Sequence, residues 1–213
     1  MSTGLLLTPG IYRMDVPIVI NTSGFVMLGI GFPTLVSQRG RSTVVVASGL
    51  SNVRVAGVLL ESGTPNSNTS AVPTQPLLQW GAPPPTPGGT HSIPTGSSGN
   101  VLSDVFARVG AFAYTTPFKK SCMATRADVM VEINTNGVIV DNTWFWHADH
   151  DDCGSASDRS YSAHGLVVNG DDVVVYGLSS EHQMDDLVLW TGDRGRVYFF
   201  QSELPYNDNS FGQ

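Results

Sequence analysis

The sequence predicts an all-β protein in which short parallel strands stack coil upon coil as a solenoid, the parallel β-helix. Three observations support this fold class. Short β-branched runs recur between residues 125 and 206, most of them are bounded by Asn, Gly or Asp, and acidic and aromatic residues occupy corresponding points of successive runs. Runs of this length and composition are typical of strands, and their repetition along the chain is typical of a solenoid.

The composition supports a folded chain with many turns. Hydrophobic residues make up 41% of the 213 residues and charged residues only 14%, which argues against disorder and against a helical bundle with its charged outer faces. The 23 Gly and 13 Pro residues predict frequent turns. A chain of this length is expected to form one domain, so we predict a single β-helix over residues 1–213.

The first sixty residues already show the strand pattern. Turns are predicted at Pro9–Gly10 and Ser23–Gly24, where residues of suitable turn chemistry separate apolar runs. Asn52 and Gly57 suit tight bends between the faces of a coil. The predicted strands in this part of the chain are 4–7, 18–20, 25–31, 34–36, 43–46 and 53–60.

Residues 62–100 differ from the rest of the chain. This segment is rich in Pro, Gly and Ser, and within it only residues 77–80 look like a strand. We interpret it as a long excursion from the solenoid rather than as a domain boundary. Because loops of this length are often functional or mobile, two roles remain open, a surface insertion and the wall of a cleft.

The second half of the chain returns to regular runs, at 101–106, 128–133, 137–140, 165–168, 172–176, 187–190 and 196–200. Segment 52–61 resembles segment 172–181, because each has a β run, a Gly bend, a second run and a final Glu. Such internal similarity indicates a β-helix or a propeller. The propeller is the weaker interpretation, since hairpin signals of the Asn-Gly type occur only at 136–137 and 169–170.

The charge and the termini limit the possible partners. The formal net charge is −7, and the 11 Lys and Arg residues form no basic stripe, so we expect neither nucleic acid nor a membrane as a partner. No apolar run is long enough to span a bilayer, and no signal peptide is visible. The strand pattern starts so early that we interpret the first residue as a boundary within a longer parent. Cys122 and Cys153 leave a disulfide open.

A candidate site follows from the polar residues near the ends of the later runs. Glu181 and Glu203 are 22 positions apart, about one coil, so we expect them on adjacent rungs of the stack. An inverting glycosidase needs one carboxylic acid to protonate the leaving oxygen and a second carboxylate, roughly 6.5–9.5 Å away, to activate water. Neighbouring rungs are only about 4.8 Å apart, so we expect diverging side chains or a two-rung offset to supply this gap. Aromatic neighbours of Glu203 predict an apolar wall that would keep that carboxyl protonated. The candidate surface comprises Trp146, Asp149, His150, Asp151, Glu181, His182 and Glu203.

Several of these residues have alternative roles. Asp149, Asp151 and Asp152 suit support of the base, sugar hydroxyls or Ca²⁺, or simply a solvated acidic loop. The histidine spacing at 147–150 matches no zinc motif, so we predict histidines that are hydrogen-bonded within turns, no transition-metal site and no cofactor, with Ca²⁺ left open. Aromatic rings stack on sugar faces, and we assign Trp146 and Tyr206 to a subsite with His150 and His182, but Trp144 and Trp190 to the core.

The chain also resembles a known family, the pectate-lyase-like β-helix proteins related to glycoside hydrolase family 55, the exo-β-1,3-glucanases. The resemblance lies in residues 7–12, 28–35, 103–110, 138–144, 146–150, 165–170 and 198–206. It implies right-handed parallel β-helices, usually two in one chain with the active site in the cleft between them, and inverting hydrolysis of β-1,3-glucan from its non-reducing end. This sequence resembles the second helix. The resemblance also favours Glu203 as the general acid.

The leading hypothesis is therefore a glycoside hydrolase acting on a β-1,3-glucan-like polysaccharide, in a parent protein that we expect to be extracellular. Glu203 would be the acid, and Glu181 with Asp149 or Asp151 would hold or activate the water. Two alternatives are a non-catalytic carbohydrate-binding or structural β-helix and a Ca²⁺-dependent polysaccharide lyase. Because a β-helix exposes strand edges at its ends, we also expect these ends to be capped or to support self-association.

Overall fold

The structure is a computed structural model that describes residues 4–63, 74–83, 98–110, 125–149 and 160–205. Every regular element within these ranges is a β-strand. The strands of the first half are β1 (Gly4–Leu7), β2 (Ile11–Met14), β3 (Ile18–Ile20), β4 (Val26–Gly29), β5 (Thr34–Ser37), β6 (Val44–Val46), β7 (Arg54–Glu61) and β8 (Leu78–Trp80). Those of the second half are β9 (Val101–Val109), β10 (Val129–Ile133), β11 (Ile139–His147), β12 (His164–Val168), β13 (Val174–Glu181), β14 (Val188–Trp190) and β15 (Arg196–Glu203).

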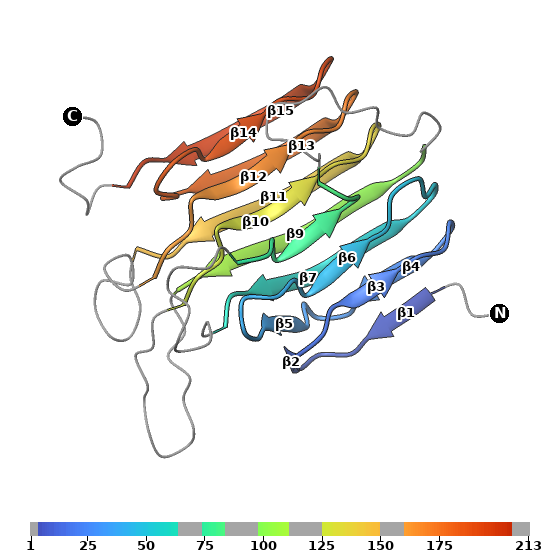
Figure 1. Ribbon diagram of the computed structural model, residues 1–213, viewed down its shortest axis with the longest axis horizontal. Helices are drawn as coiled ribbons and strands as arrows, with labels where there is room; N and C mark the ends of the chain where they lie inside the picture. The colour runs from blue at the N-terminus through green and yellow to red at the C-terminus, as the bar shows by residue number, and fades with distance from the viewer. Residues whose placement is uncertain (1–3, 64–73, 84–97, 111–124, 150–159, 206–213) are drawn as a thin grey trace.

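The strands form two sheets, each made of parallel strands, and each coil contributes strands to both sheets. The larger sheet runs β1-β4-β7-β9-β11-β13-β15, with β2 and β5 as a short branch beside β7, and the smaller sheet runs β14-β12-β10-β8-β6-β3. From β7 onward the chain alternates between the sheets strand by strand, and Figure 1 shows the coils stacked from β1 at one end to β15 at the other. This is the parallel β-helix that the sequence predicts.

Left-handed residues shape each coil at two fixed places. One column of positive-φ residues precedes the long strands, and a second column lies five positions later, inside them. Register pairs show that the members of each column lie on top of one another. The first column is Gly24, Asn52, Gly99, Gly137, Asp172 and Arg194, and the second is Gly57, Asp104, Asn142, Gly177 and Phe199. The predicted bends at Asn52 and Gly57 are therefore confirmed, with φ values of 56° and 71°.

The second column corrects the predicted lengths of three strands. The runs predicted to end at residues 140, 176 and 200 continue as strands to His147, Glu181 and Glu203. A single left-handed residue bends each of these strands without breaking its ladder, because pairing resumes at the next residue. Trp146, Glu181 and Glu203 thus belong to the strands, and were wrongly placed just beyond them.

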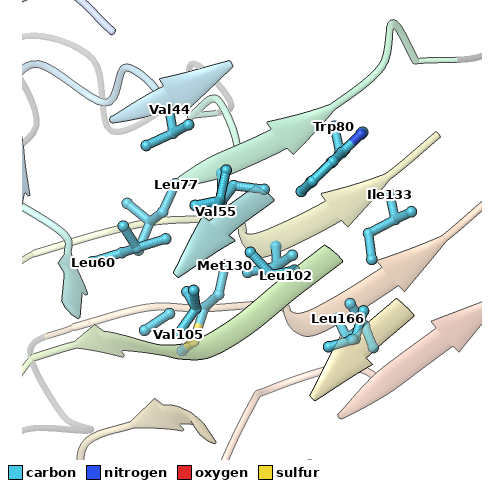
Figure 2. Packing of buried hydrophobic residues seen from close by; sticks show 14 of the residues in the cluster. Val44, Val55, Leu60, Leu77, Trp80, Leu102, Val105, Met130, Ile133 and Leu166 are labelled. Atoms are coloured by element: carbon cyan, nitrogen blue, oxygen red, sulfur yellow. The ribbon is translucent and has the colours of Figure 1, made fainter. Parts of the chain in front are cut away.

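The core fills the space between the two sheets. In the larger sheet the inward column runs through Val55, Leu102, Val140 and Val175, and all four side chains are fully buried. Facing columns of the smaller sheet are equally buried, and Figure 2 shows several of these side chains packed between the strands. These facing residues are Val44, Leu78, Val131 and Leu166, with Trp80 and Ile133 beside them. Burial of each such side chain contributes about 1.5–3 kcal/mol to folding.

The internal similarity seen in the sequence corresponds to real equivalence. Segments 52–61 and 172–181 occupy the same register, and Glu61 and Glu181 fall in one row. Within the excursion at 62–100, residues 78–80 form β8, as their sequence predicts. The rest of that excursion lies mostly outside the described residues, as do Cys122 and Cys153.

The last strand is less covered than its neighbours. Phe200 continues the inward column of Leu178, yet Phe200 is 49% exposed while Leu178 is 1% exposed. No described strand pairs with the outer edge of β15. An unpaired edge beside exposed apolar side chains favours association with another strand. Capping or self-association at this end stays a prediction.

Candidate active site

Three neighbouring strands place six side chains in a grid on the outer face of the larger sheet. One row is Trp144 on β11, Ser179 on β13 and Gln201 on β15, and the next row is Trp146, Glu181 and Glu203. Residues two apart on a strand point to the same face, so each strand contributes one residue to each row. The residues between the rows, Phe145 and Ser180, are fully buried, which confirms that the grid faces outward.

The two tryptophans form a flat aromatic surface at one side of the grid. The Trp144 and Trp146 ring centroids are 5.3 Å apart and the planes are inclined by 23°, a stacked pair. Trp144 is 40% exposed, so its assignment to the core was wrong. The error comes from treating its run as buried on both faces, whereas alternation along β11 turns residues 144 and 146 outward together.

The two glutamates are brought side by side, as the coil spacing predicts. Glu181 and Glu203 are direct register partners, so their backbones are separated by the inter-strand distance of about 4.8 Å. The Ser179 hydroxyl donates to Glu181 Oε1 at 2.6 Å, and Gln201 Nε2 donates to Glu203 Oε1 at 3.3 Å. Ser179 Oγ also contacts Gln201 Oε1. Ser179 and Gln201 therefore link the two carboxyl groups.

A buried histidine lies behind the acid candidate. His182 Nε2 is 3.3 Å from Glu203 Oε2, and His182 Nδ1 is 3.3 Å from the carbonyl oxygen of His147 and 4.0 Å from Asp149 Oδ1. The side chain of His182 is 4% exposed and that of Asp149 is 12% exposed. The imidazole thus connects a largely buried carboxylate with the half-exposed Glu203. Its burial favours a role behind Glu203 over direct contact with a sugar.

His147 supports this arrangement from inside the coil. Its ring nitrogens lie 2.8 Å from the carbonyl oxygen of His182 and 3.0 Å from that of Ser160. The predicted hydrogen bonding is confirmed, but His147 ends β11 and does not lie in a turn. Burial lowers the pKa of His147, and the two carbonyl contacts oppose this effect. The folded protein therefore favours the neutral ring.

The row that contains Glu181 and Glu203 continues into the earlier strands β9 and β7, where its two residues form an ion pair. Arg108 is the register partner of both Trp146 and Glu61, and its Nη2 lies 2.8 Å from Glu61 Oε2. Burial raises the pKa of Glu61, and the Arg108 charge opposes this shift. Glu61 thus fills a structural role at a position equivalent to Glu181.

The structure brings together five of the eight residues proposed for the site: Trp146, Asp149, Glu181, His182 and Glu203. His150, Asp151 and Tyr206 lie outside the described residues. The predicted apolar wall around Glu203 is not seen among described residues, because its side chain is 52% exposed on the last strand of the sheet. Sequence reasoning missed Ser179, Gln201 and the outward position of Trp144. Their signal was their spacing, two residues before Glu181, Glu203 and Trp146.

Among the described residues, no group of three His, Cys, Asp or Glu side chains is arranged to hold a metal ion. In the same part of the chain, no helix has the length and apolar character to cross a membrane.

Comparison with known proteins identifies the relatives of this chain. The family model described as the LAM55 pectate lyase-like domain matches residues 1–203. An exo-beta-1,3-glucanase from Streptomyces sp. (strain SirexAA-E / ActE) is 32% identical over 203 residues, which are 95% of this chain and 29% of that protein. A glucan 1,3-beta-glucosidase from Cochliobolus carbonum is 29% identical over 122 residues, 51% of this chain and 16% of that protein.

Solved structures give the same result for the fold. A structure of sacteLam55A from Streptomyces sp. SirexAA-E matches with a TM-score of 0.73 at 29% identity, covering 92% of this chain and 31% of that chain. A variant of the same protein, in complex with glucose, matches with a TM-score of 0.72 at 28% identity and covers 93% of this chain. These matches confirm the right-handed parallel β-helix. The chain spans about three tenths of the length of these Streptomyces relatives.

Proposed function

Because the chain belongs to the family of LAM55 pectate lyase-like domains, we propose that it forms part of a glycoside hydrolase acting on β-1,3-glucan. The observation that carries this proposal is the pairing of Glu181 with Glu203 on one exposed face, beside the stacked Trp144 and Trp146. A carboxyl pair next to an aromatic surface provides acid–base groups together with a place for a sugar ring.

In the proposed reaction Glu203 acts as the general acid. Its carboxyl proton moves to the glycosidic oxygen as the bond from that oxygen to the anomeric carbon breaks. Glu181 accepts a proton from a water molecule, and the oxygen of this water bonds to the anomeric carbon from the opposite face. The product has inverted configuration. Glu181 then releases its proton to solvent, and Glu203 takes up a proton from solvent, which restores both groups. His182 and Asp149 support the acid from behind, through the 3.3 Å and 4.0 Å contacts of the imidazole.

The test is hydrolysis of laminarin by this chain and by Glu203→Gln, followed by release of glucose. We expect release by the parent chain and a loss of about 10²–10⁴-fold in the variant, because general acid catalysis typically contributes that much. Proton NMR of the first product distinguishes α-glucose, the inverted anomer, from β-glucose. Unchanged activity in Glu203→Gln would remove Glu203 from the reaction.

A second candidate function is a non-catalytic carbohydrate-binding module, which the exposed Trp144–Trp146 pair favours independently of the carboxyl groups. Isothermal calorimetry with laminari-oligosaccharides separates the two functions. Binding without glucose release supports the module, and release that depends on Glu203 supports the hydrolase.

A further inference from the structure

An aromatic row continues from the candidate active site into the earlier coils of the larger sheet. Phe106 on β9 is the direct register partner of Trp144 on β11, so their backbones lie about 4.8 Å apart. Both side chains point outward, because the residues that follow them, Ala107 and Phe145, are buried. The Phe106 ring in turn meets the ring of Phe32, with centroids 5.2 Å apart and planes inclined by 34°. Three rings thus cross the sheet from β11 toward the first coils.

The backbone of Phe32 is strained although its side chain is not buried. Its φ is 52°, a left-handed value that is rare for a bulky residue, and the side chain is 46% exposed. Packing in the core therefore does not explain this conformation. Residues with such strain concentrate at ligand-binding sites, and here the strained backbone sets the ring against Phe106 on the outside of the coil.

Two polar side chains lie along one side of the aromatic row. Asp104 and Asn142 each precede an aromatic residue of the row by two positions, and Asn142 Nδ2 donates to Asp104 Oδ1 at 2.7 Å across the two strands. Their φ values are 52° and 51°, whereas the coils on either side carry glycine at the same position, Gly57 and Gly177. Glycine adopts this conformation at lower cost, so the backbone alone does not require a side chain at these two positions.

The aromatic row and the polar pair together suit a glucose unit. The hydroxyl groups of β-glucose are equatorial, so axial C–H groups form both faces of its ring and the hydroxyl groups lie at its edge. A sugar ring flat on Phe106 places its C–H groups on the aromatic face and its edge beside Asp104 and Asn142. Among the described residues no group donates to Asp104 Oδ2 or to Asn142 Oδ1, so the pair offers two acceptors to sugar hydroxyl groups.

We propose that Phe106 and Phe32, with Asp104 and Asn142 beside them, form a distal sugar subsite for the part of the glucan beyond the unit that stacks on Trp144. The bound chain then runs along the coil axis, from the carboxyl pair on β13 and β15 past β11 to β9, which are consecutive strands of the sheet (Figure 1). This inference rests on the proposed function and adds the direction and the length of the chain that the site holds. A disaccharide between the carboxyl pair and Trp144 does not reach the distal subsite, whereas a tetrasaccharide does.

The test therefore compares two chain lengths. Isothermal calorimetry gives the affinities of laminaribiose and laminaritetraose for the parent and for three variants, Phe106→Ala, Phe106→Leu and Asn142→Gly. All are made in the Glu203→Gln background, so that the oligosaccharides stay intact. Phe106→Leu keeps apolar packing against Phe32 but removes the aromatic ring. Asn142→Gly removes the amide and leaves a residue that suits the left-handed backbone.

Two controls repeat these changes away from the distal subsite. Tyr176→Ala removes an exposed ring from the outer face of β13, where it stacks on Tyr198. Asn52→Gly makes the same change as Asn142→Gly at another left-handed position, with a φ of 56°, in the first column.

We expect the parent and both controls to bind laminaritetraose about tenfold more tightly than laminaribiose, because the longer chain stacks on a further aromatic ring. Both Phe106 variants should reduce this ratio to about twofold or less and leave the affinity for laminaribiose unchanged. Asn142→Gly should reduce the ratio about threefold without lowering the free energy of unfolding, because it removes a hydrogen-bonding group and relieves the backbone.

The same ratio in Phe106→Leu as in the parent, or equal affinities for the two lengths in the parent, would overturn the inference. A parallel fall of both affinities in the Phe106 variants would place Phe106 at the unit on Trp144, which also overturns it. The proposed hydrolase function fails by a different result, namely hydrolysis that persists in Glu203→Gln. In that case the ratio of kcat/KM for the two lengths replaces the ratio of affinities, with the same expected changes.

Discussion

Glu61 and Glu181 lie in the same row of the larger sheet, at equivalent positions of β7 and β13, yet their surroundings differ completely. Glu61 is 6% exposed and pairs with Arg108 at 2.8 Å, while Glu181 is partly exposed and accepts a hydrogen bond from Ser179. One repeated position of the coil thus carries a structural ion pair in one turn and a candidate catalytic carboxylate in another.

This relationship predicts that the same substitution affects stability at Glu61 and activity at Glu181. Glu61→Ala leaves the Arg108 guanidinium largely buried without its carboxylate and should lower the free energy of unfolding by about 3 kcal/mol. Glu181→Ala should change stability by less than about 1 kcal/mol and reduce glucan hydrolysis instead. Urea denaturation and laminarin assays on both variants measure the two effects. Equal destabilisation by both substitutions would contradict the distinction.

The aromatic surface predicts a loss of sugar affinity. Trp144→Ala removes the more exposed member of the stacked pair and should weaken binding of a laminari-oligosaccharide about tenfold, or roughly 1.4 kcal/mol. Tyr176→Ala provides the control, because Tyr176 on β13 stacks on Tyr198 on β15, away from the tryptophan pair on β11. Isothermal calorimetry gives both affinities, and a larger loss in Tyr176→Ala would place the sugar elsewhere.

The position of His182 predicts different effects for two amide replacements. Gln places its amide near the position of Nε2, next to Glu203, whereas Asn places it near Nδ1, next to the carbonyl oxygen of His147. We expect His182→Gln to retain more hydrolysis than His182→Asn, by about tenfold in kcat, because only Gln still contacts Glu203. Thermal unfolding of both variants controls for loss of structure. Equal kcat values at equal stability would separate His182 from the function of Glu203.

The buried His147 predicts an acid-dependent loss of stability. Burial lowers the pKa of His147 in the folded state, whereas in the unfolded state the ring has the ordinary histidine pKa of about 6.5. The unfolded state therefore binds the proton more readily. The stability that the neutral ring contributes is present above about pH 6.5 and is lost as the pH falls through the lowered pKa. The difference in unfolding free energy between the parent and His147→Gln should therefore shrink or reverse below pH 6.5. A constant difference from pH 8 to 5 would contradict this.

The second column of left-handed residues predicts that one substitution stabilises the protein and that another destabilises it. Phe199 has a φ of 64° and is 79% exposed, so its side chain contributes little burial while its backbone is strained. Phe199→Gly should raise the unfolding free energy by about 1 kcal/mol, and Gly177→Ala, at a φ of 63° in the same column, should lower it by a similar amount. Thermal or urea denaturation tests both signs.

The fold was readable from the sequence because its signal is local and repeated. Each coil carries β-branched runs and a turn residue, and the matching order in 52–61 and 172–181 already places Glu61 and Glu181 at equivalent points. The spacing of 22 positions likewise predicted that Glu181 and Glu203 become neighbours, which their register confirms.

What the sequence could not show depends on the bends and on the ends of the stack. The face of Trp144 follows from the left-handed Asn142, because that residue sets which later side chains of β11 point outward. The exposure of Glu203 follows from its position on the last strand, where aromatic neighbours in sequence do not form a wall in space. The contact of His182 with Glu203 joins different coils, so no local sequence pattern predicts it.

The two columns of left-handed residues also set rules for how this fold can vary. Five positions separate the columns in every described coil from β7 to β15, whereas successive members of the first column from Asn52 to Arg194 are 47, 38, 35 and 22 positions apart. Additions to the connecting segments are therefore absorbed outside the ladder. One residue added between Asp172 and Gly177, in contrast, would shift the alternation of β13 and turn Glu181 toward the interior. We therefore expect insertions and deletions in the connecting segments, and a constant length for the five-position interval between the two columns.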